Sequence, residues 1–324
     1  MRDKILSMLQ EGQEISGEAI SRALNISRAA VGKHIQVLRE AGYQIAAAPR
    51  RGYRLISAPD LLNQIEIGRW LPPDSPWRID DFPELDTTMR EARRLAEEGA
   101  AEYRVVIAEW QTAGIGRLGR PWYGPAGSGL WMALLFRPHM APTEAQQLTL
   151  CNAVAIAETL TALGFPVGIK WPNDILSLHP DYPHRKLCGI RTEMRADSDR
   201  VEWLISGIGV NINMTEFPPE LQDIACSLRM LQQGRPLRRS QLAAALLQQI
   251  EQTYRQLSNS GFAELRQRWL AHAVGIGEQV SIHAPNGMER GIATGMDEAG
   301  YLLLLPEDGG PERRILAGDM VLRT

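Results

Sequence analysis

The glycine-rich segment 111–122, Gln-Thr-Ala-Gly-Ile-Gly-Arg-Leu-Gly-Arg-Pro-Trp, most constrains what this chain can fold into. Gly114, Gly116 and Gly119 have the G-x-G-x-x-G spacing of dinucleotide-binding folds. Those folds need a helix that begins within the glycines and an acidic residue about 20 positions later. Here Pro121 follows directly, a histidine stands 20 positions after the last glycine, and no Gly-Lys-Ser/Thr ending marks a P-loop. The segment is therefore predicted to be an irregular loop after a strand.

Cationic and aromatic side chains define the chemistry of this loop. Glycines leave backbone amides free to face an anion, and Arg117 and Arg120 add guanidinium groups suited to phosphate oxygens. Trp122 supplies a flat apolar surface for a bound ring. The loop is a candidate site for a phosphate or an acyl-phosphate. Spacing alone leaves one alternative open, which is an ordinary surface loop with solvated arginines.

Two later segments carry related chemistry. The sequence Lys-Trp-Pro-Asn-Asp at 170–174 predicts a strand end and a turn, and Lys186 then begins another strand close to Gly189. A lysine in that place can direct its ammonium group at a bound oxyanion, although a solvated surface lysine is the commoner case. Gly207 and Gly209 interrupt an apolar strand, which indicates close approach of a ligand or another backbone, or a bulge without function.

The middle of the chain mixes strand-like and helical patterns. Runs rich in Val, Ile, Leu and Trp predict strands at 103–110, 129–136, 167–171, 186–194 and 201–213. Helical patterns are found at 88–98, 143–163, 240–257 and 261–272. This mixture predicts an α+β domain in which helices pack on a sheet.

The first 58 residues form a pattern of their own. Helical periodicity predicts helices at 2–11, from Ser16 to about residue 24, and from Ser27 to about residue 41, with the two serines as N-caps. The inward-facing residues of the third helix are Val31, Ile35 and Leu38. A hairpin between 43–45 and 52–55 follows, with a basic tip.

Charge makes this small module a candidate for binding nucleic acid. Residues 1–58 hold nine Lys/Arg against five Asp/Glu, whereas the whole chain has a net charge of −3. Small residues let a helix approach base edges, and Arg, Lys and Gln contact phosphates and bases. A helical scaffold with a solvated face is the alternative. The candidate DNA-binding residues are Gly17, Ser27, Arg28, Ala29, Lys33, Gln36, Arg50 and Arg51.

The last 50 residues change to short strands, predicted at 279–283, 291–296, 301–305 and 313–317 and separated by turn residues. This predicts a small antiparallel barrel. No apolar stretch approaches the roughly 20 residues that span a bilayer, and no signal-peptide core follows the N-terminus. The three cysteines are odd in number and lack C-x-x-C spacing, so we expect a cytoplasmic protein with no direct metal-ligand cluster.

Taken in order, these segments carry a family resemblance. The glycine-arginine loop, Lys-Trp-Pro-Asn-Asp, Lys-Leu-Cys-Gly-Ile and Gly-Ile-Gly-Val-Asn resemble the catalytic domain of biotin protein ligases. The segment from Ser27 to Gly42 is similar to the recognition helix of the biotin operon repressor family. The resemblance implies a winged helix-turn-helix domain at 1–62, a class II aminoacyl-tRNA synthetase-like α+β catalytic domain at 63–272, and an SH3-like β barrel at 273–324.

The function that this resemblance implies has two parts. The enzyme would activate biotin with ATP and Mg²⁺ to biotinyl-5′-AMP, then transfer biotin to a lysine of the biotin carboxyl carrier protein of acetyl-CoA carboxylase. The adenylate would also favour a homodimer that binds operator DNA and represses biotin synthesis genes.

The resemblance also implies site residues. Lys186, Arg117 and Arg120 would be catalytic. The biotin-binding residues would be Thr87, Thr88, Met89, Gln111, Gly114, Ile115, Gly116, Arg117, Lys186 and Gly189. The residues near ATP or the adenylate would be Arg117, Arg120, Trp122, Asn173 and Asn211.

Two positions depart from the family pattern. Ile115 replaces a polar or basic residue, and Met89 replaces an asparagine. These departures leave a biotin-sensing transcription factor with little catalysis as one alternative function. A ligase for another acid, such as lipoate or octanoate, is a second alternative, because those enzymes share the fold.

Overall fold

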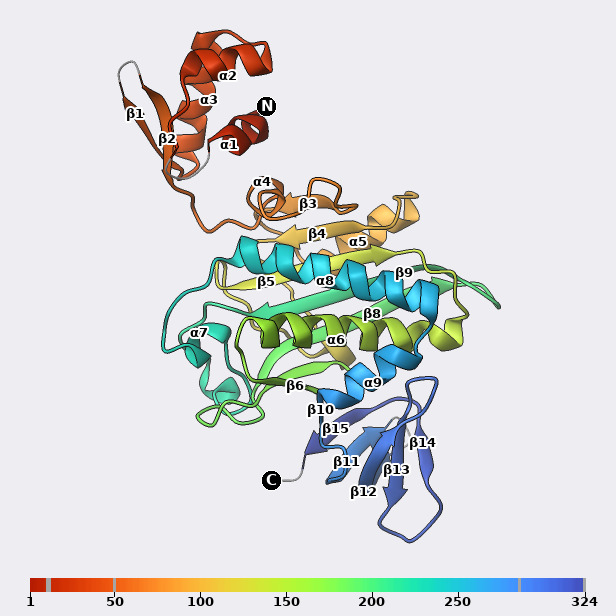
Figure 1. Cartoon of the computed structure of the whole chain (residues 1–324). Coiled ribbons are helices and arrows are strands. Elements are labelled where there is room, and N and C mark those ends of the chain that lie inside the picture. Colours follow the sequence, from red (N-terminus) through yellow and green to blue (C-terminus); the bar gives the residue numbers. More distant parts are fainter. Residues whose placement is uncertain (10–12, 49–50, 285–286, 323–324) are drawn as a thin grey trace.

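The computed structural model describes residues 1–9, 13–48, 51–284 and 287–322, and it separates an N-terminal module from a larger body (Figure 1). The module consists of α1 (Arg2–Met8), α2 (Gly17–Leu24), α3 (Arg28–Glu40), β1 (Gln44–Ala48) and β2 (Gly52–Ser57).

The N-terminal module folds as its sequence predicts. The Ser16 and Ser27 hydroxyls accept hydrogen bonds from the backbone N–H three residues on, at 3.0 and 3.1 Å, so both serines are the N-caps. Val31, Ile35 and Leu38 are buried in the core of this module, and Ile65, from the segment that follows the module, also packs against that core. The two strands form the antiparallel hairpin.

An eight-stranded sheet forms the centre of the body, with the order β10-β6-β7-β8-β9-β5-β4-β3. All neighbours are antiparallel except the end pairs β3/β4 and β10/β6. The strands are β3 (Arg78–Phe82), β4 (Arg104–Ala108), β5 (Gly129–Phe136), β6 (Val167–Lys170), β7 (Asp174–Ser177), β8 (Lys186–Ala196), β9 (Val201–Asn211) and β10 (Ala273–Val274).

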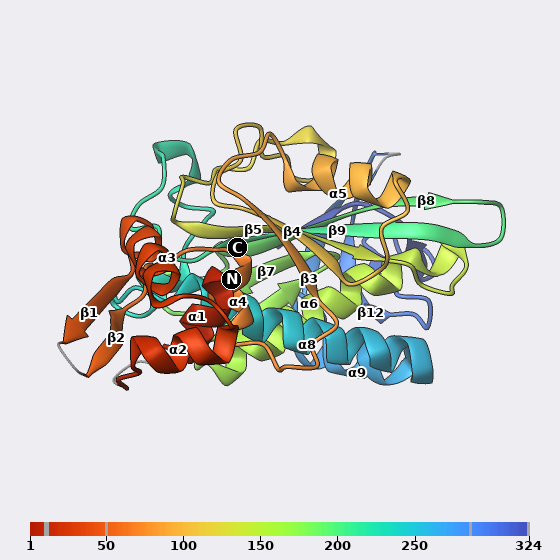
Figure 2. The ribbon, with the colours of Figure 1, turned by 90° about the horizontal axis from the view of Figure 1, so that it is seen from above.

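Helices cover the two faces of this sheet unequally (Figure 2). The helices α6 (Ala145–Ala162), α8 (Arg239–Ser260) and α9 (Ala263–Ala271) lie on one face, and α5 (Thr88–Glu97) lies on the other. Strand alternation serves both faces, since Val105 and Ile107 join the larger core while Val106 packs with α5. Because α5 is short, it covers only part of this face of the sheet, and the rest of the face remains available for a site. The short helices α4 (Gln64–Gly68) and α7 (Leu228–Leu231) lie in connections.

The C-terminal module is an antiparallel sheet with the order β14-β13-β12-β11-β15. Its strands are β11 (Gln279–Ala284), β12 (Gly287–Met296), β13 (Leu302–Pro306), β14 (Arg313–Ile315) and β15 (Asp319–Leu322). Gln146 of α6 donates to the Gly300 carbonyl at 2.6 Å, and Arg266 of α9 donates to the Met296 carbonyl, which docks the module on the body.

Four of the observed strands, β3, β7, β10 and β15, were not predicted from the sequence. β3 is an edge strand whose sequence, Arg-Ile-Asp-Asp-Phe, is mostly charged. The predicted turn is present at residues 171–173, but it ends one residue earlier than predicted, because Asp174 already begins β7, a strand that was not predicted. β10 and β15 were missed because segments of two to four residues have too little pattern to identify. Among the described residues, no helix is long and apolar enough to cross a membrane.

Candidate active site

A cavity of about 200 Å³ lies on the α5 face of the sheet, beside the N-terminal end of that helix. Its floor includes glycines from neighbouring strands. Gly189 of β8 pairs directly with Gly209 of β9, and Gly207 lies two residues away on the same face. Since none of the three has a side chain, the sheet is bare there.

Trp122 occupies part of this bare surface. A Cβ at Gly209 would lie 2.8 Å from the Trp122 ring, and a Cβ at Gly189 would also lie 2.8 Å from it. The glycines are therefore needed for the ring to approach the sheet. The Lys186 ammonium lies 5.3 Å from the ring centroid, which is cation–π distance.

The polar end of the cavity is organised around Gln111. Its side-chain oxygen accepts from the Thr88 N–H at 2.7 Å and from the Thr88 hydroxyl at 3.1 Å. With the oxygen engaged, the amide NH₂ is left to donate to a ligand. Thr87 instead caps α5, because its hydroxyl accepts from the Arg90 N–H. Met89 packs against Gly207, where a Cβ would lie 2.6 Å from the sulfur.

Lys186 is held at the cavity by a buried carboxylate. Its Nζ lies 2.6 Å from Asp174 Oδ1, and Lys170 Nζ lies 3.1 Å from Asp174 Oδ2. Burial raises the pKa of the Asp174 carboxyl, but the ammonium groups of Lys186 and Lys170 outweigh it and hold that pKa below the ordinary value. The aspartate therefore stays ionised and orients Lys186.

Replacing Asp174 with asparagine is expected to destabilise the protein by about 1–3 kcal/mol, because two partly buried lysines lose their counter-ion. The folded-state pKa of Asp174 is depressed, so its ion pairs stabilise at every pH above the ordinary aspartate value near 3.9. That stabilisation is lost as the pH falls through the lowered folded-state value. Thermal unfolding of both proteins should give a constant Tm difference from about pH 5 to 8 that shrinks below about pH 4.

Asp308→Asn, at an exposed ion pair with Arg313, is the matched control and should change Tm far less. A Tm difference for Asp174→Asn that grows as the pH falls would contradict this account.

Arg117 and Arg120 reach across to the C-terminal module. Arg117 Nη1 donates to Asn173 Oδ1 at 2.8 Å and lies 3.0 Å from Asp319 Oδ1. Arg120 Nη1 lies 3.2 Å from the other oxygen of Asp319. Asn173 in turn donates to the Ile190 carbonyl at 2.7 Å. Asn173 thereby connects the glycine loop, through Arg117, to β8. One carboxylate of β15 thus pairs with both arginines of the glycine loop.

Most residues expected at the site line this cavity. Those are Thr87, Thr88, Met89, Gln111, Ile115, Gly116, Arg117, Trp122, Asn173, Lys186 and Gly189. Three others do not line it. Gly114 packs behind Trp122, Arg120 is largely exposed, and the Asn211 amide donates to the backbone carbonyls of Lys186 and Cys226.

Sequence reasoning missed a charged rim on the cavity. Arg191 and Glu193 of β8 are an ion pair at 2.7 Å, and Arg93 of α5 also pairs with Glu193. Arg191 lies 3.5 and 3.4 Å from the carbonyl oxygens of Ile115 and Gly116. The available signal was strand alternation, since Arg191 and Glu193 follow Gly189 at intervals of two.

The candidate DNA-binding residues lie mostly on one exposed surface of α3. Ser27, Arg28, Ala29, Lys33 and Gln36 are exposed, and Gly17 lies at the start of α2 beside Tyr53. Arg51 pairs with Glu14 at 2.8 Å. Arg50 lies outside the described residues.

Comparison with family models places three matches along the chain. Residues 2–54 match an HTH domain, residues 82–211 match the biotin/lipoate A/B protein ligase family, and residues 275–323 match the biotin protein ligase C-terminal domain.

Whole-chain relatives and solved structures agree with these matches. The chain is 39% identical to the bifunctional ligase/repressor BirA of Bacillus subtilis (strain 168), over 99% of this chain and 98% of that protein. It is 31% identical to BirA of Escherichia coli (strain K12), over 99% and 97%. The biotin protein ligase from Aquifex aeolicus, solved in complex with biotin and ATP, superposes with a TM-score of 0.64 at 29% identity, covering 76% of this chain and 98% of that one.

Proposed function

This chain belongs to the biotin/lipoate protein ligase family, among its bifunctional ligase/repressors, and from that premise we propose a role for each part of its structure. The protein activates biotin with ATP to biotinyl-5′-AMP and transfers biotin to a lysine of the biotin carboxyl carrier protein. It also represses transcription through its N-terminal DNA-binding module. We assign the domains to residues 1–62, 63–272 and 273–324.

The two half-reactions require little covalent chemistry from the protein. The biotin carboxylate attacks the α-phosphorus of ATP, which releases pyrophosphate and forms the mixed anhydride biotinyl-5′-AMP. The carrier lysine then attacks the anhydride carbonyl, and AMP leaves. The protein therefore has to position both substrates, stabilise negative charge and exclude water from a hydrolysable intermediate.

The observation that carries this proposal is the pairing of two cations with buried or half-buried carboxylates at the cavity. Asp174 holds Lys186, and Asp319 holds Arg117. Cations that are already in place stabilise developing charge without reorganisation. We assign Lys186 to the carboxylate and α-phosphate of the reacting pair and Arg117 to the phosphate. Arg120 assists from the same loop.

Biotin recognition falls to the Gln111 end of the cavity. The free NH₂ of Gln111 is available to donate to the ureido ring, and Thr88 fixes its orientation. Met89, Gly189 and the backbone of Gly116 would contact the apolar part and the carboxylate. Trp122 lies on the glycine floor, where it can cover the adenylate, and Asn173 ties the loop to the strand.

Several partners belong to this proposal. Mg²⁺ would be held mainly by the ATP phosphates, as is usual for that ion, with Asn173 and Asn211 nearby. The adenylate-bound form would be a homodimer on two half-sites of an operator. ATP, DNA and the carrier protein meet in the cytoplasm, so we place the enzyme there.

ATP–pyrophosphate exchange with the purified protein tests the activity. Exchange should depend on biotin and be absent with lipoate or octanoate. Exchange with lipoate or octanoate instead would identify a ligase for another acid. Biotin binding without exchange for any acid would identify a sensor with little catalysis.

Replacing Lys33 with alanine tests the DNA-binding face. The exposed lysine of α3 is expected to contact a phosphate, so its loss should weaken duplex binding and lower the slope of log K against log salt by about one. Arg22→Ala is the control, because Arg22 lies on α2 in an exposed pair with Glu18. Equal salt slopes for wild type and Lys33→Ala, measured by fluorescence anisotropy, would rule this contact out.

A further inference from the structure

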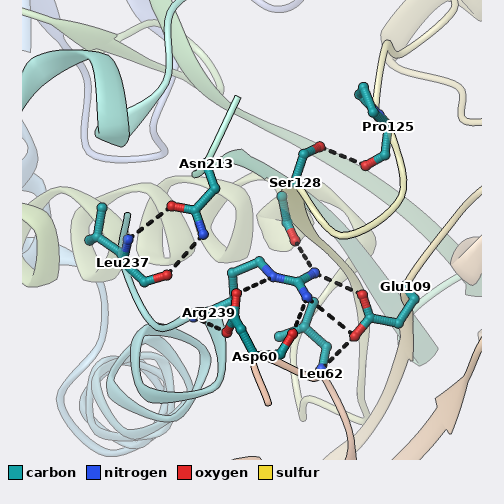
Figure 3. Close-up of polar contacts among 9 residues, drawn as sticks. Asp60, Leu62, Glu109, Pro125, Ser128, Asn213, Leu237 and Arg239 are labelled. Carbon is teal, nitrogen blue, oxygen red and sulfur yellow. Dashed lines mark hydrogen bonds and ion pairs between the residues drawn. The ribbon is translucent and has the colours of Figure 1, made fainter. Parts of the chain in front are cut away.

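A buried arginine lies where three distant segments of the chain meet (Figure 3). Arg239 is the first residue of α8 and only 2% exposed. Its Nε donates to Asp60 Oδ2 and its Nη1 donates to Glu109 Oε2, both at 2.8 Å. Nη1 also reaches the Gly129 carbonyl at 3.3 Å. The Arg239 Nη2 donates to the Asp60 backbone carbonyl. The guanidinium group thus binds two carboxylates and two backbone oxygens.

Two of these contacts lie at the two ends of the glycine loop. Glu109 directly follows β4 and precedes Trp110 and Gln111, whereas Gly129 is the first residue of β5. The Gly127 N–H also donates to the Glu109 carbonyl. Arg239 therefore binds both stems of the loop that carries Gln111 and Arg117.

The third contact lies in the connection from the N-terminal module. Asp60 stands between β2, the last element of that module, and α4 of the body. Its carboxylate accepts from the Arg239 backbone N–H at 2.8 Å as well as from the side chain, and so caps the N-terminus of α8. The Leu62 N–H, two residues on, donates to Glu109 at 2.6 Å. The connection and the loop stem therefore share one buried network.

We propose that Arg239 is a positioning residue that joins the ligand loop to the connection of the DNA-binding module, so that ordering the loop and placing the module are energetically coupled. The proposal rests on the function assigned to the glycine loop above. By thermodynamic linkage this coupling is reciprocal. If bound adenylate increases the affinity for DNA by some factor, bound DNA must increase the affinity for adenylate by the same factor.

Removing Asp60 alone separates this coupling from folding. In Asp60→Ala the buried Arg239 still pairs with Glu109, so no unpaired charge remains in the interior. Asp60 itself does not line the cavity. Asp81→Ala is the matched control, because Asp81 Oδ1 accepts from the Gln64 N–H at 2.9 Å and so ties the start of α4, directly after the connection, to β3 but not to the loop.

The experiment measures duplex binding by the full-length protein with and without biotin plus ATP. Wild type should bind DNA more tightly with the ligands than without them. The ratio of these two DNA affinities should be roughly fivefold or more smaller in Asp60→Ala than in wild type. The biotin KM in pyrophosphate exchange should rise while kcat stays within about twofold, since the reacting groups are untouched. Asp81→Ala should keep the wild-type ratio and KM.

A merely structural role for Asp60 would weaken DNA binding equally with and without ligand, and that unchanged ratio would overturn the proposal. If Asp81→Ala also lost the ligand-dependent increase in DNA affinity, the proposal would be overturned, because any loosening near the connection would then be enough to abolish the coupling. Failure of the proposed function is a separate result, because wild type itself would then show no biotin-dependent exchange.

Discussion

Replacing Lys186 with alanine is expected to lower biotin-dependent pyrophosphate exchange by roughly a hundred- to a thousandfold, the usual cost of removing one preorganised donor to a developing oxyanion. The Lys186 ammonium lies 3.2 Å from where a Cβ at Gly189 would be, and Asp174 holds it there at 2.6 Å. Biotin binding, measured by calorimetry, should weaken much less than kcat. The loss is expected in the chemical step because the charge that Lys186 stabilises grows in the transition state.

Lys170→Ala is the matched control for this prediction. Lys170 pairs with the same aspartate at 3.1 Å but does not line the cavity. Its loss should perturb stability and leave exchange near the wild-type rate. Substantial exchange by Lys186→Ala would remove Lys186 from the catalytic role and reassign it to ligand affinity, as in a sensor with little catalysis.

Replacing Gly209 with alanine is expected to weaken ligand binding without unfolding the protein. The new Cβ would lie 2.8 Å from the Trp122 ring, so the ring must leave the glycine floor. Overpacking of this kind costs about 1–3 kcal/mol, which corresponds to roughly 5- to 150-fold in affinity. The displaced indole would also occupy space needed by the adenylate. The biotin and ATP KM values in pyrophosphate exchange should therefore both rise.

Gly295→Ala controls for the substitution itself. Gly295 is also a strand glycine, in β12, and a Cβ there meets nothing within 4 Å. Its kinetics should match wild type. Wild-type KM values for Gly209→Ala, with a wild-type Tm, would show that the Trp122 position seen here is unrelated to ligand binding.

Local pattern was enough to predict much of this molecule. The caps at Ser16 and Ser27 were correctly predicted because a capping hydroxyl meets an N–H only three residues away. The apolar strand at 129–136 was predicted with its observed bounds, since every one of its residues is buried. The grouping of the glycine loop with Lys186 came from the family resemblance, and both line one cavity. Their catalytic roles remain predictions.

Contacts between charged residues that are far apart in the sequence could not be predicted from local sequence patterns. Arg117 and Asp319 are separated by 202 residues, and Arg239 and Asp60 by 179, yet each pair is in direct contact. Nothing in the neighbouring residues of Asp60 or Asp319 distinguishes them from solvated surface carboxylates.

The sequence by itself thus determined the longer helices, the main strands, the caps and the types of chemistry available, because those depend on periodicities of 2 and 3.6 residues and on groups a few positions apart. It did not predict the short helices α4 and α7. Only the tertiary structure decided which carboxylate neutralises which cation, and that the connection to the DNA-binding module and the ligand loop share Arg239. An ion pair in the interior forms where the packing of whole elements brings two charges together and excludes water.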